Sequence, residues 1–214
     1  MLKSRQEIKA HAKAAMKEQR GVSILAPLVF IAIAIVGGLF GLIPAIGLLL
    51  VYATLFFIDF PLAVNLEGMF VKIYNREQTS VGEMFEKLQV NYLRKVGGMA
   101  WMTLFVFLWF LLFFIPGFVK AIAYSMTPFI LATCPNVKAK DALKLSMRMT
   151  KGHKGKLFVM MLSFIGWLLL GGLTLHILTV VFVMPYYYTT WAGYFTELKN
   201  NAIETGVISA EELQ

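Results

Sequence analysis

The first apolar run of the chain decides its class, and it reads VSILAPLVFIAIAIVGGLFGLI (residues 22–43). No charged residue interrupts it. A helix of this length reaches about 33 Å, which is enough to cross the hydrocarbon core of a bilayer, about 30 Å thick. The run is also longer than the apolar part of a cleaved signal peptide. We therefore interpret it as a retained first membrane span.

The rest of the chain continues this pattern. Its 214 residues are 58% hydrophobic and 15% charged, whereas a soluble domain is about 45–50% apolar and about 25% charged. The sequence predicts an all-α fold, a polytopic membrane helical bundle of six transmembrane helices paired as three hairpins. The predicted spans are about 22–43, 45–67, 96–115, 117–134, 157–171 and 173–195. We expect the turns of the hairpins at Ile43-Pro44-Ala45, Ile115-Pro116-Gly117 and Gly171-Gly172.

The basic residues predict the orientation. Six lie in the N-terminal arm, five in residues 72–95 and seven in residues 136–156, and with Lys199 they make nineteen of the twenty Lys and Arg residues. In a six-span topology all nineteen fall on one side, which we call the basic side. Lysine and arginine are retained on the cytoplasmic side during insertion. Both termini are therefore predicted to be cytoplasmic, and Lys120 is the exception to the pattern.

The segments outside the spans are predicted to lie on the membrane. Residues 1–21 form a basic interfacial helix, in which Ile8, Ala12, Ala15 and Gln19 share one face. A partly ordered, solvated arm is the alternative. Residues 72–95 and 136–156 each contain a short amphipathic helix, residues 22–199 make up the membrane domain, and residues 200–214 form a polar cytoplasmic tail. The basic side chains of the arm that would meet anionic headgroups are Lys3, Arg5, Lys9, Lys13, Lys17 and Arg20.

Each returning helix carries a proline, at Pro61, Pro128 and Pro185. A proline removes one backbone hydrogen bond and kinks a helix, which frees a carbonyl one turn earlier. We expect these carbonyls at Phe57, Tyr124 and Val181. Three related kinks are consistent with a repeated hairpin around a central cavity, and equally with ordinary kinks of membrane helices.

The stretch from Leu108 to Leu198 resembles domain-of-unknown-function family 975, small polytopic integral membrane proteins, mostly of Firmicutes. The resemblance implies a bacterial cell membrane location and no established activity. One departure is Thr174-Leu175-His176-Ile177, where the family has a Thr-x-Gly-Ile stretch, and it puts close helix packing there in question. The residues that carry the resemblance are LWFLLFFIPG (108–117), KAIAYSM (120–126), ALKLS (142–146), KGHK (151–154), LSFIGW (162–167) and Pro185-Tyr186.

Three ionisable residues are candidates for a polar membrane site: Asp59, Lys120 and His176. A carboxylate at the centre of a span costs about 2.5–3.5 kcal/mol, so Asp59 indicates a proton- or cation-linked site, a polar lipid contact, or a protonated side chain bonded to a neighbouring helix. Lys120 lies about 18 Å from it along the membrane normal, counted at 1.5 Å per residue, which favours snorkelling to the outer surface over an ion pair. The alternative for Lys120 is an anion or headgroup contact.

A dense basic segment supplies the candidate contacts for anionic headgroups or a partner protein. The glycines in it do not have the spacing of a phosphate-binding loop, so flanking charge that fixes the topology is the competing interpretation. The candidate residues are Arg148, Lys151, His153, Lys154 and Lys156.

Catalytic and metal-binding patterns are missing from the sequence. There is no His-Glu-x-x-His and no Gly-x-Ser-x-Gly, and Cys134 is the single cysteine. Glu67, eight residues after Asp59, is expected near the interface, so it does not complete an intramembrane carboxylate pair. We predict no catalytic residue, no metal, no cofactor and no nucleic-acid partner.

The sequence leaves two functions open. The first is a non-catalytic integral membrane protein that binds lipid or a membrane-protein partner, in a scaffold, sensor, accessory or immunity-type role. The second is a small transporter or lipid-translocating protein with a polar cavity near Asp59. The oligomeric state is not indicated by any pattern in the sequence.

The topology makes a testable prediction. Single cysteines introduced at positions 45 and 172 are expected to react with a membrane-impermeant maleimide added outside intact cells, and cysteines at 78 and 140 are expected to be protected. Reaction of position 140 from outside would overturn the six-span topology.

Overall fold

The computed structural model describes residues 3–174 and 176–213, and all of the regular elements in them are helices, which confirms the all-α prediction. The helices are α1 (Arg5–Glu18), α2 (Arg20–Leu39), η1 (Phe40–Leu42), α3 (Gly47–Thr54), η2 (Leu55–Asp59), α4 (Phe60–Tyr74), α5 (Gly82–Glu86), α6 (Tyr92–Leu112), α7 (Phe114–Tyr124), α8 (Thr127–Thr133), α9 (Ala139–Thr150), α10 (Lys154–Leu162), α11 (Ile165–Leu173), η3 (Thr179–Val183), α12 (Met184–Glu204) and η4 (Ala210–Leu213).

Most of the apolar sequence lies in three helical hairpins. α2 pairs with α3, η2 and α4; α6 pairs with α7 and α8; and α10 and α11 pair with η3 and α12. The sixth predicted span, about 173–195, falls on η3 and α12 and is not among the stretches of sufficient apolarity, so the six-span topology stays a prediction. The stretches that are long and apolar enough to cross a membrane are Arg20–Leu42, Gly47–Tyr74, Tyr92–Leu112, Phe114–Thr133 and Lys154–Leu173.

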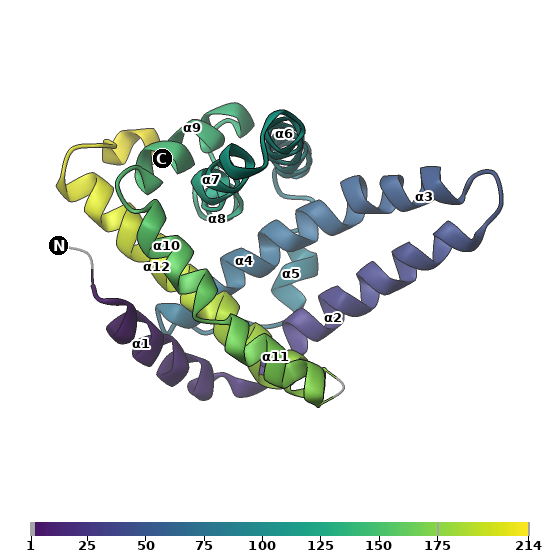
Figure 1. Cartoon of the computed structure of the whole chain (residues 1–214), viewed down its shortest axis with the longest axis horizontal. Coiled ribbons are helices and arrows are strands. Elements are labelled where there is room, and N and C mark those ends of the chain that lie inside the picture. Colours follow the sequence, from purple (N-terminus) through teal and green to yellow (C-terminus); the bar gives the residue numbers. More distant parts are fainter. Residues whose placement is uncertain (1–2, 175, 214) are drawn as a thin grey trace.

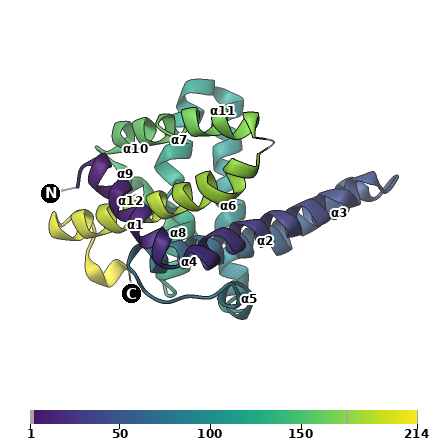
Figure 2. The ribbon, with the colours of Figure 1, turned by 90° about the horizontal axis from the view of Figure 1, so that it is seen from below.

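The hairpins diverge from a common centre. In Figure 1 the hairpin of α2 and α3 extends to the right and that of α11 and α12 extends downward, and in Figure 2 α6 and α7 rise away from α2 and α3 toward α11. Their tips are apolar and uncovered: Leu42 is 80% exposed and Leu173 is 83% exposed. Water would not support apolar surface of this extent, whereas lipid does.

Two of the three predicted turns are displaced along the chain. The second turn is at Phe113, where the backbone is extended (φ −154°, ψ 129°), so Pro116 lies in the first turn of α7. Proline is accommodated there because the missing N–H has no partner in the first turn. The third turn follows Leu173, and Gly171 lies within α11. A Cβ on Gly171 would come within 1.9 Å of Thr179 Oγ1, so this glycine allows the two arms of the hairpin to approach closely.

The three returning helices are interrupted just ahead of their prolines. A π-helical turn precedes Pro61 and another precedes Pro185. The Phe57 carbonyl, in the first of these turns, accepts a 2.5 Å hydrogen bond from Tyr92 Oη on α6. The interruption is thus satisfied by a neighbouring hairpin, as the lack of water in a membrane requires.

At the remaining proline, Pro128, the helix breaks between α7 and α8. Ser146 of α9 joins the two ends: its Oγ accepts from Met126 N (3.1 Å) and donates to the Ala123 carbonyl (2.7 Å). The break therefore depends on a side chain from the amphipathic segment on the basic side.

α1 packs on the protein, against α4 and α12. Its Ile8 and Ala12 side chains are fully buried, and Ser4 and Glu7 form a capping box at its start. Lys3 forms an ion pair with Glu197 (2.7 Å), and Lys9 donates to Ser163 Oγ (2.7 Å). Two of the six basic side chains predicted to meet headgroups thus contact the protein's own residues.

The centre of the molecule is formed by α4, α8 and α12, with their apolar faces turned toward one another. Phe70 of α4 stacks on Tyr188 of α12, with ring centroids 5.1 Å apart, and Phe129 of α8 stacks on Phe195 of α12 at 5.2 Å. Gly68 brings α4 against Ala132, since a Cβ on Gly68 would lie 2.9 Å from the Ala132 Cβ. This centre fixes the walls of both cavities described below.

Arg94, near the start of α6, caps the end of α8. Its guanidinium donates to the carbonyl oxygens of Leu131, Cys134 (3.0 Å) and Val137 (2.7 Å). The final carbonyls of a helix lack partners within the helix, and a cation there also meets the negative end of the helix dipole. Arg94 thereby holds the second hairpin to the centre.

We expect Arg94→Met to reduce the free energy of unfolding by about 3 kcal/mol, because it leaves partly buried carbonyls without donors. Titration of detergent-solubilised protein with sodium dodecyl sulfate, followed by circular dichroism, measures the change. Arg20→Met is the matched control, since Arg20 is exposed and its side chain forms no hydrogen bond or ion pair with another described residue. Equal stability of the two variants would contradict the capping role.

Candidate functional site

The most unusual side chain of the protein is Glu67, in the middle of α4. It lines a pocket of about 460 Å³, and its Oε2 atom is buried without a hydrogen-bond partner among the described residues. Buried carboxylates are ordinarily paired or hydrogen-bonded, because desolvation of the charge is costly. The remaining wall of the pocket is apolar or aromatic, apart from Ser125: Met99, Met102, Val106, Phe110, Phe118, Ala121, Ile122, Pro128, Phe129, Met161, Tyr187, Tyr188 and Trp191.

This pocket continues into a second one of about 470 Å³, further along α10, α11 and η3. The two pockets share five residues, so they form one groove, which we call the Glu67 groove. Outer positions of the groove such as Phe158, Ile165 and Leu168 are exposed, so it opens on the surface that faces lipid. The shared residues are Phe118, Ile122, Met161, Tyr187 and Tyr188.

The sequence predicts Glu67 near the membrane interface, and the structure adds that its carboxyl group is enclosed by protein. Glu67 shares a helical face with Phe60, Val64 and Val71, all of which are buried. The spacing of three, four and seven residues that defines this face was available in the sequence. The burial of Glu67 was not predicted, because distance along the span indicates a depth in the membrane and not the face on which a residue lies.

Asp59 lies at the end of the π-helical turn η2, eight residues before Glu67, and faces another helix. It lines a pocket between α2 and η2 in which the other residues are apolar except Thr54. Its Oδ1 atom is buried without a partner in the described part of the chain. The polar cavity predicted near Asp59 is therefore replaced by an apolar groove that contains one carboxyl group.

Lys120 and His176, the other two candidates for this membrane site, do not contact Asp59. The Lys120 ammonium lies over the Trp109 ring, 4.7 Å from its centroid. His176 is exposed in the turn of the third hairpin with φ +63°. A left-handed backbone is favourable for glycine, which gives a physical reason for the glycine that the resemblance leads us to expect here. Leu175, the other residue of that departure, lies outside the described residues.

The basic segment, residues 136–156, contains one side chain that binds the protein's own C-terminal segment and others that form no ion pair with the described residues. Arg148 forms an ion pair with Glu212 (2.7 Å) and donates to the Val207 carbonyl, so it binds the C-terminal segment of its own chain. Lys151 and Lys156 are exposed, Lys154 is partly exposed, and none of the three has an ion-pair partner among the described residues. The predicted tail is correspondingly folded, with Ile208 and Leu213 buried.

One protein family matches the chain, and it is described as "Protein of unknown function (DUF975)"; the match covers residues 92–202. Because this is more than half of the 214 residues, the chain belongs to that family. No curated protein and no solved structure matches it. The matched region includes most walls of the Glu67 groove, whereas Glu67 itself lies in the first hairpin, outside the match.

Proposed function

We propose that this member of the DUF975 family is a non-catalytic membrane protein that binds an amphiphile with a positively charged head in the Glu67 groove. The observation that carries the proposal is the buried, unpartnered Oε2 of Glu67 in a pocket with otherwise mainly apolar walls. Ligand pockets are typically of this kind, mostly apolar with a few polar groups that set the orientation of the ligand.

The chemistry of the wall favours a cation over a neutral head. A positively charged group would pair with the Glu67 carboxylate, which otherwise lacks compensation for its burial. Tyr187, Tyr188 and Trp191 line the same pocket, and aromatic faces attract cations, most of all when water is excluded. An ammonium head would thus find both an anion and aromatic faces.

The chemistry of the outer part of the groove fits an apolar tail. It is lined by Phe158, Leu162, Ile165 and Leu168 among others, and it offers only Thr179 and tyrosines as polar groups. Each methylene group transferred from water to such a surface contributes about 0.8 kcal/mol. A long chain would therefore lie along α10 and α11.

The predicted topology places the head in the cytoplasmic leaflet. Glu67 precedes Lys72 by five residues, or about 8 Å of helix, and Lys72 belongs to the basic side. An amphiphile with its head at Glu67 and its tail toward Leu168 would have the orientation of a lipid in that leaflet.

The transport hypothesis has less support. The two acidic residues of the first hairpin line different pockets that share no residue. A continuous polar path between Asp59 and Glu67 would be expected of a carrier of ions or headgroups, and the pocket at Asp59 is apolar.

Long-chain amines provide the test. We expect the full-length protein in phosphatidylcholine nanodiscs to bind dodecylamine at least about tenfold more tightly than dodecanol, because only the amine pairs with the carboxylate. Glu67→Gln is expected to remove this preference while keeping the thermal stability, since glutamine has the same shape without the charge. Native mass spectrometry of the released protein measures both ligands in competition.

Two further variants make the experiment decisive. Asp59→Asn should keep the preference for the amine. Met102→Trp should weaken the binding of both ligands, because the larger side chain fills the pocket. If wild type does not distinguish the two ligands, or if Glu67→Gln still prefers the amine, the proposed function is wrong. Loss of the preference in Asp59→Asn alone would move the site to the other groove.

A further inference from the structure

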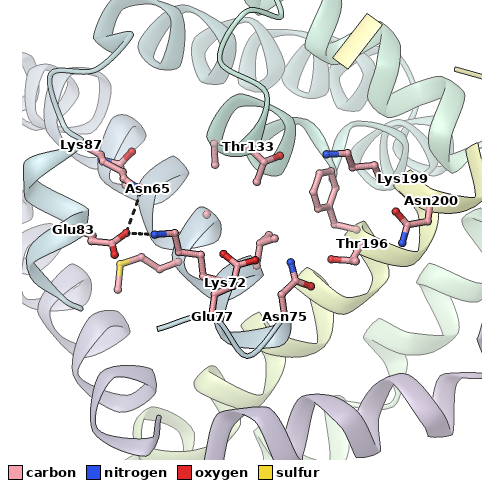
Figure 3. A pocket seen from close by; sticks show the side chains of 15 residues that line it. Asn65, Lys72, Asn75, Glu77, Glu83, Lys87, Thr133, Thr196, Lys199 and Asn200 are labelled. Carbon is pink, nitrogen blue, oxygen red and sulfur yellow. Dashed lines mark hydrogen bonds and ion pairs between the residues drawn. The ribbon is translucent and has the colours of Figure 1, made fainter. Parts of the chain in front are cut away.

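A second cavity, of about 390 Å³, lies on the basic side between the ends of α4, α5, α8 and α12 (Figure 3). It is separated from the Glu67 groove by stacked aromatic rings: Phe129 lines the groove, Phe195 lines this cavity, and their centroids are 5.2 Å apart. Unlike the other pockets described here, which are mainly apolar, it is lined by many polar and charged side chains. These are Asn65, Lys72, Asn75, Glu77, Glu83, Lys87, Thr133, Thr196, Lys199 and Asn200.

The charges around this cavity do not balance. Lys72 and Lys87 both bind one carboxylate oxygen, Glu83 Oε2, at 2.7 and 3.1 Å. Burial alone would raise the pKa of the Glu83 carboxyl, but the hydrogen bonds from Lys72 and Lys87 outweigh it and hold that pKa below its usual range. Lys199 reaches from α12 toward Thr133 (Figure 3) and has no ion-pair partner among the described residues.

A buried ammonium behind the wall adds to this imbalance. Lys95 of α6 is only 4% exposed, and its Nζ donates to Asn65 Oδ1 and to the Lys87 carbonyl, both at 2.6 Å. These acceptors are neutral, so the charge of Lys95 is solvated by dipoles without being neutralised. Three ammonium groups therefore line the cavity and a fourth lies behind its wall, against the carboxylates of Glu83 and Glu77, so the balance of charge favours an anion there.

Neutral donors complete the site. Asn65 is held in place, because its Nδ2 donates to the Met84 carbonyl (2.7 Å) while Lys95 binds its Oδ1. Asn75, at the end of α4, and Asn200, on α12, line the same space (Figure 3), whereas the hydroxyls of Thr133 and Thr196 donate to the carbonyls of Phe129 and Ala192. Ammonium and amide groups around one cavity are donors with which proteins bind phosphate oxygens.

We propose that this cavity binds a phosphate group presented from the basic side of the protein. The group would accept hydrogen bonds from Lys199 and from the amide donors, while Lys72, Lys87 and Lys95 supply the favourable potential. Two sources share this chemistry: a water-soluble phosphate, and the headgroup of a phosphomonoester lipid. The proposal does not depend on the Glu67 groove, since the two sites share no lining residue.

Inorganic phosphate and phosphatidic acid are the probes. Calorimetry on the full-length protein in phosphatidylcholine nanodiscs measures the binding of phosphate, and native mass spectrometry from nanodiscs that also contain phosphatidic acid measures retained lipid. We expect Lys199→Gln to weaken the binding of whichever probe the wild type binds by about tenfold. This is the effect of losing one charge-assisted hydrogen bond. Lys13→Gln is the matched control, because it removes the same charge at an exposed position of α1 that does not line the cavity.

Each outcome decides. Lys199-dependent binding of inorganic phosphate supports a soluble ligand, and Lys199-dependent retention of phosphatidic acid alone supports the lipid headgroup. Equal losses in Lys199→Gln and Lys13→Gln would mean that net charge accounts for the binding, which overturns the site. Failure of wild type to bind either probe overturns it as well. Thr196→Val, which keeps all charges, should weaken binding less than Lys199→Gln does.

Discussion

The contact between α4 and α12 is the interaction on which the rest of the structure depends. The Phe70–Tyr188 stack holds the two helices together, and Gly193 leaves room for Tyr74 and Ile8, so that α1 packs over both. α8 joins them through Phe129 and Gly68, and α6 is attached through the Arg94 cap. Because both cavities take their walls from α4, α8 and α12, a change in this packing would alter both sites together.

The membrane fold could be read from the sequence because lipid imposes strong and simple rules. Length and apolarity predicted the apolar helices, although α4 continues to Tyr74 and α12 to Glu204, beyond the predicted ends at 67 and 195, and the predicted turn at Pro44 was placed correctly. The turns near Pro116 and Gly171 were displaced because proline and glycine each have two roles in a helix. Proline starts a helix as well as ending one, and glycine allows close packing as well as turns.

The candidate site was harder to predict, since it depends on faces and on contacts between hairpins. Asp59 was a predicted site residue because it stands alone in an apolar run. The carboxylate in the more extended Glu67 groove is nevertheless Glu67. The cavity on the basic side could not have been predicted from the sequence. Lys72, Lys95 and Lys199 come from three distant segments, and in the sequence each has the same appearance as a lysine that flanks a span.

The π-helical turn η2 explains how a single helix serves two unrelated environments. A π-helical turn contains one residue more than an α-helical turn, which rotates everything beyond it by about 100° around the axis. Asp59 closes this turn and faces α2, whereas Glu67 faces the groove beside α12. The extra residue thus works as a fixed angular offset between the tip of the first hairpin and its base. Loss of one residue from positions 55–58 would keep every atom of both acidic side chains and still turn the hairpin tip to a different face.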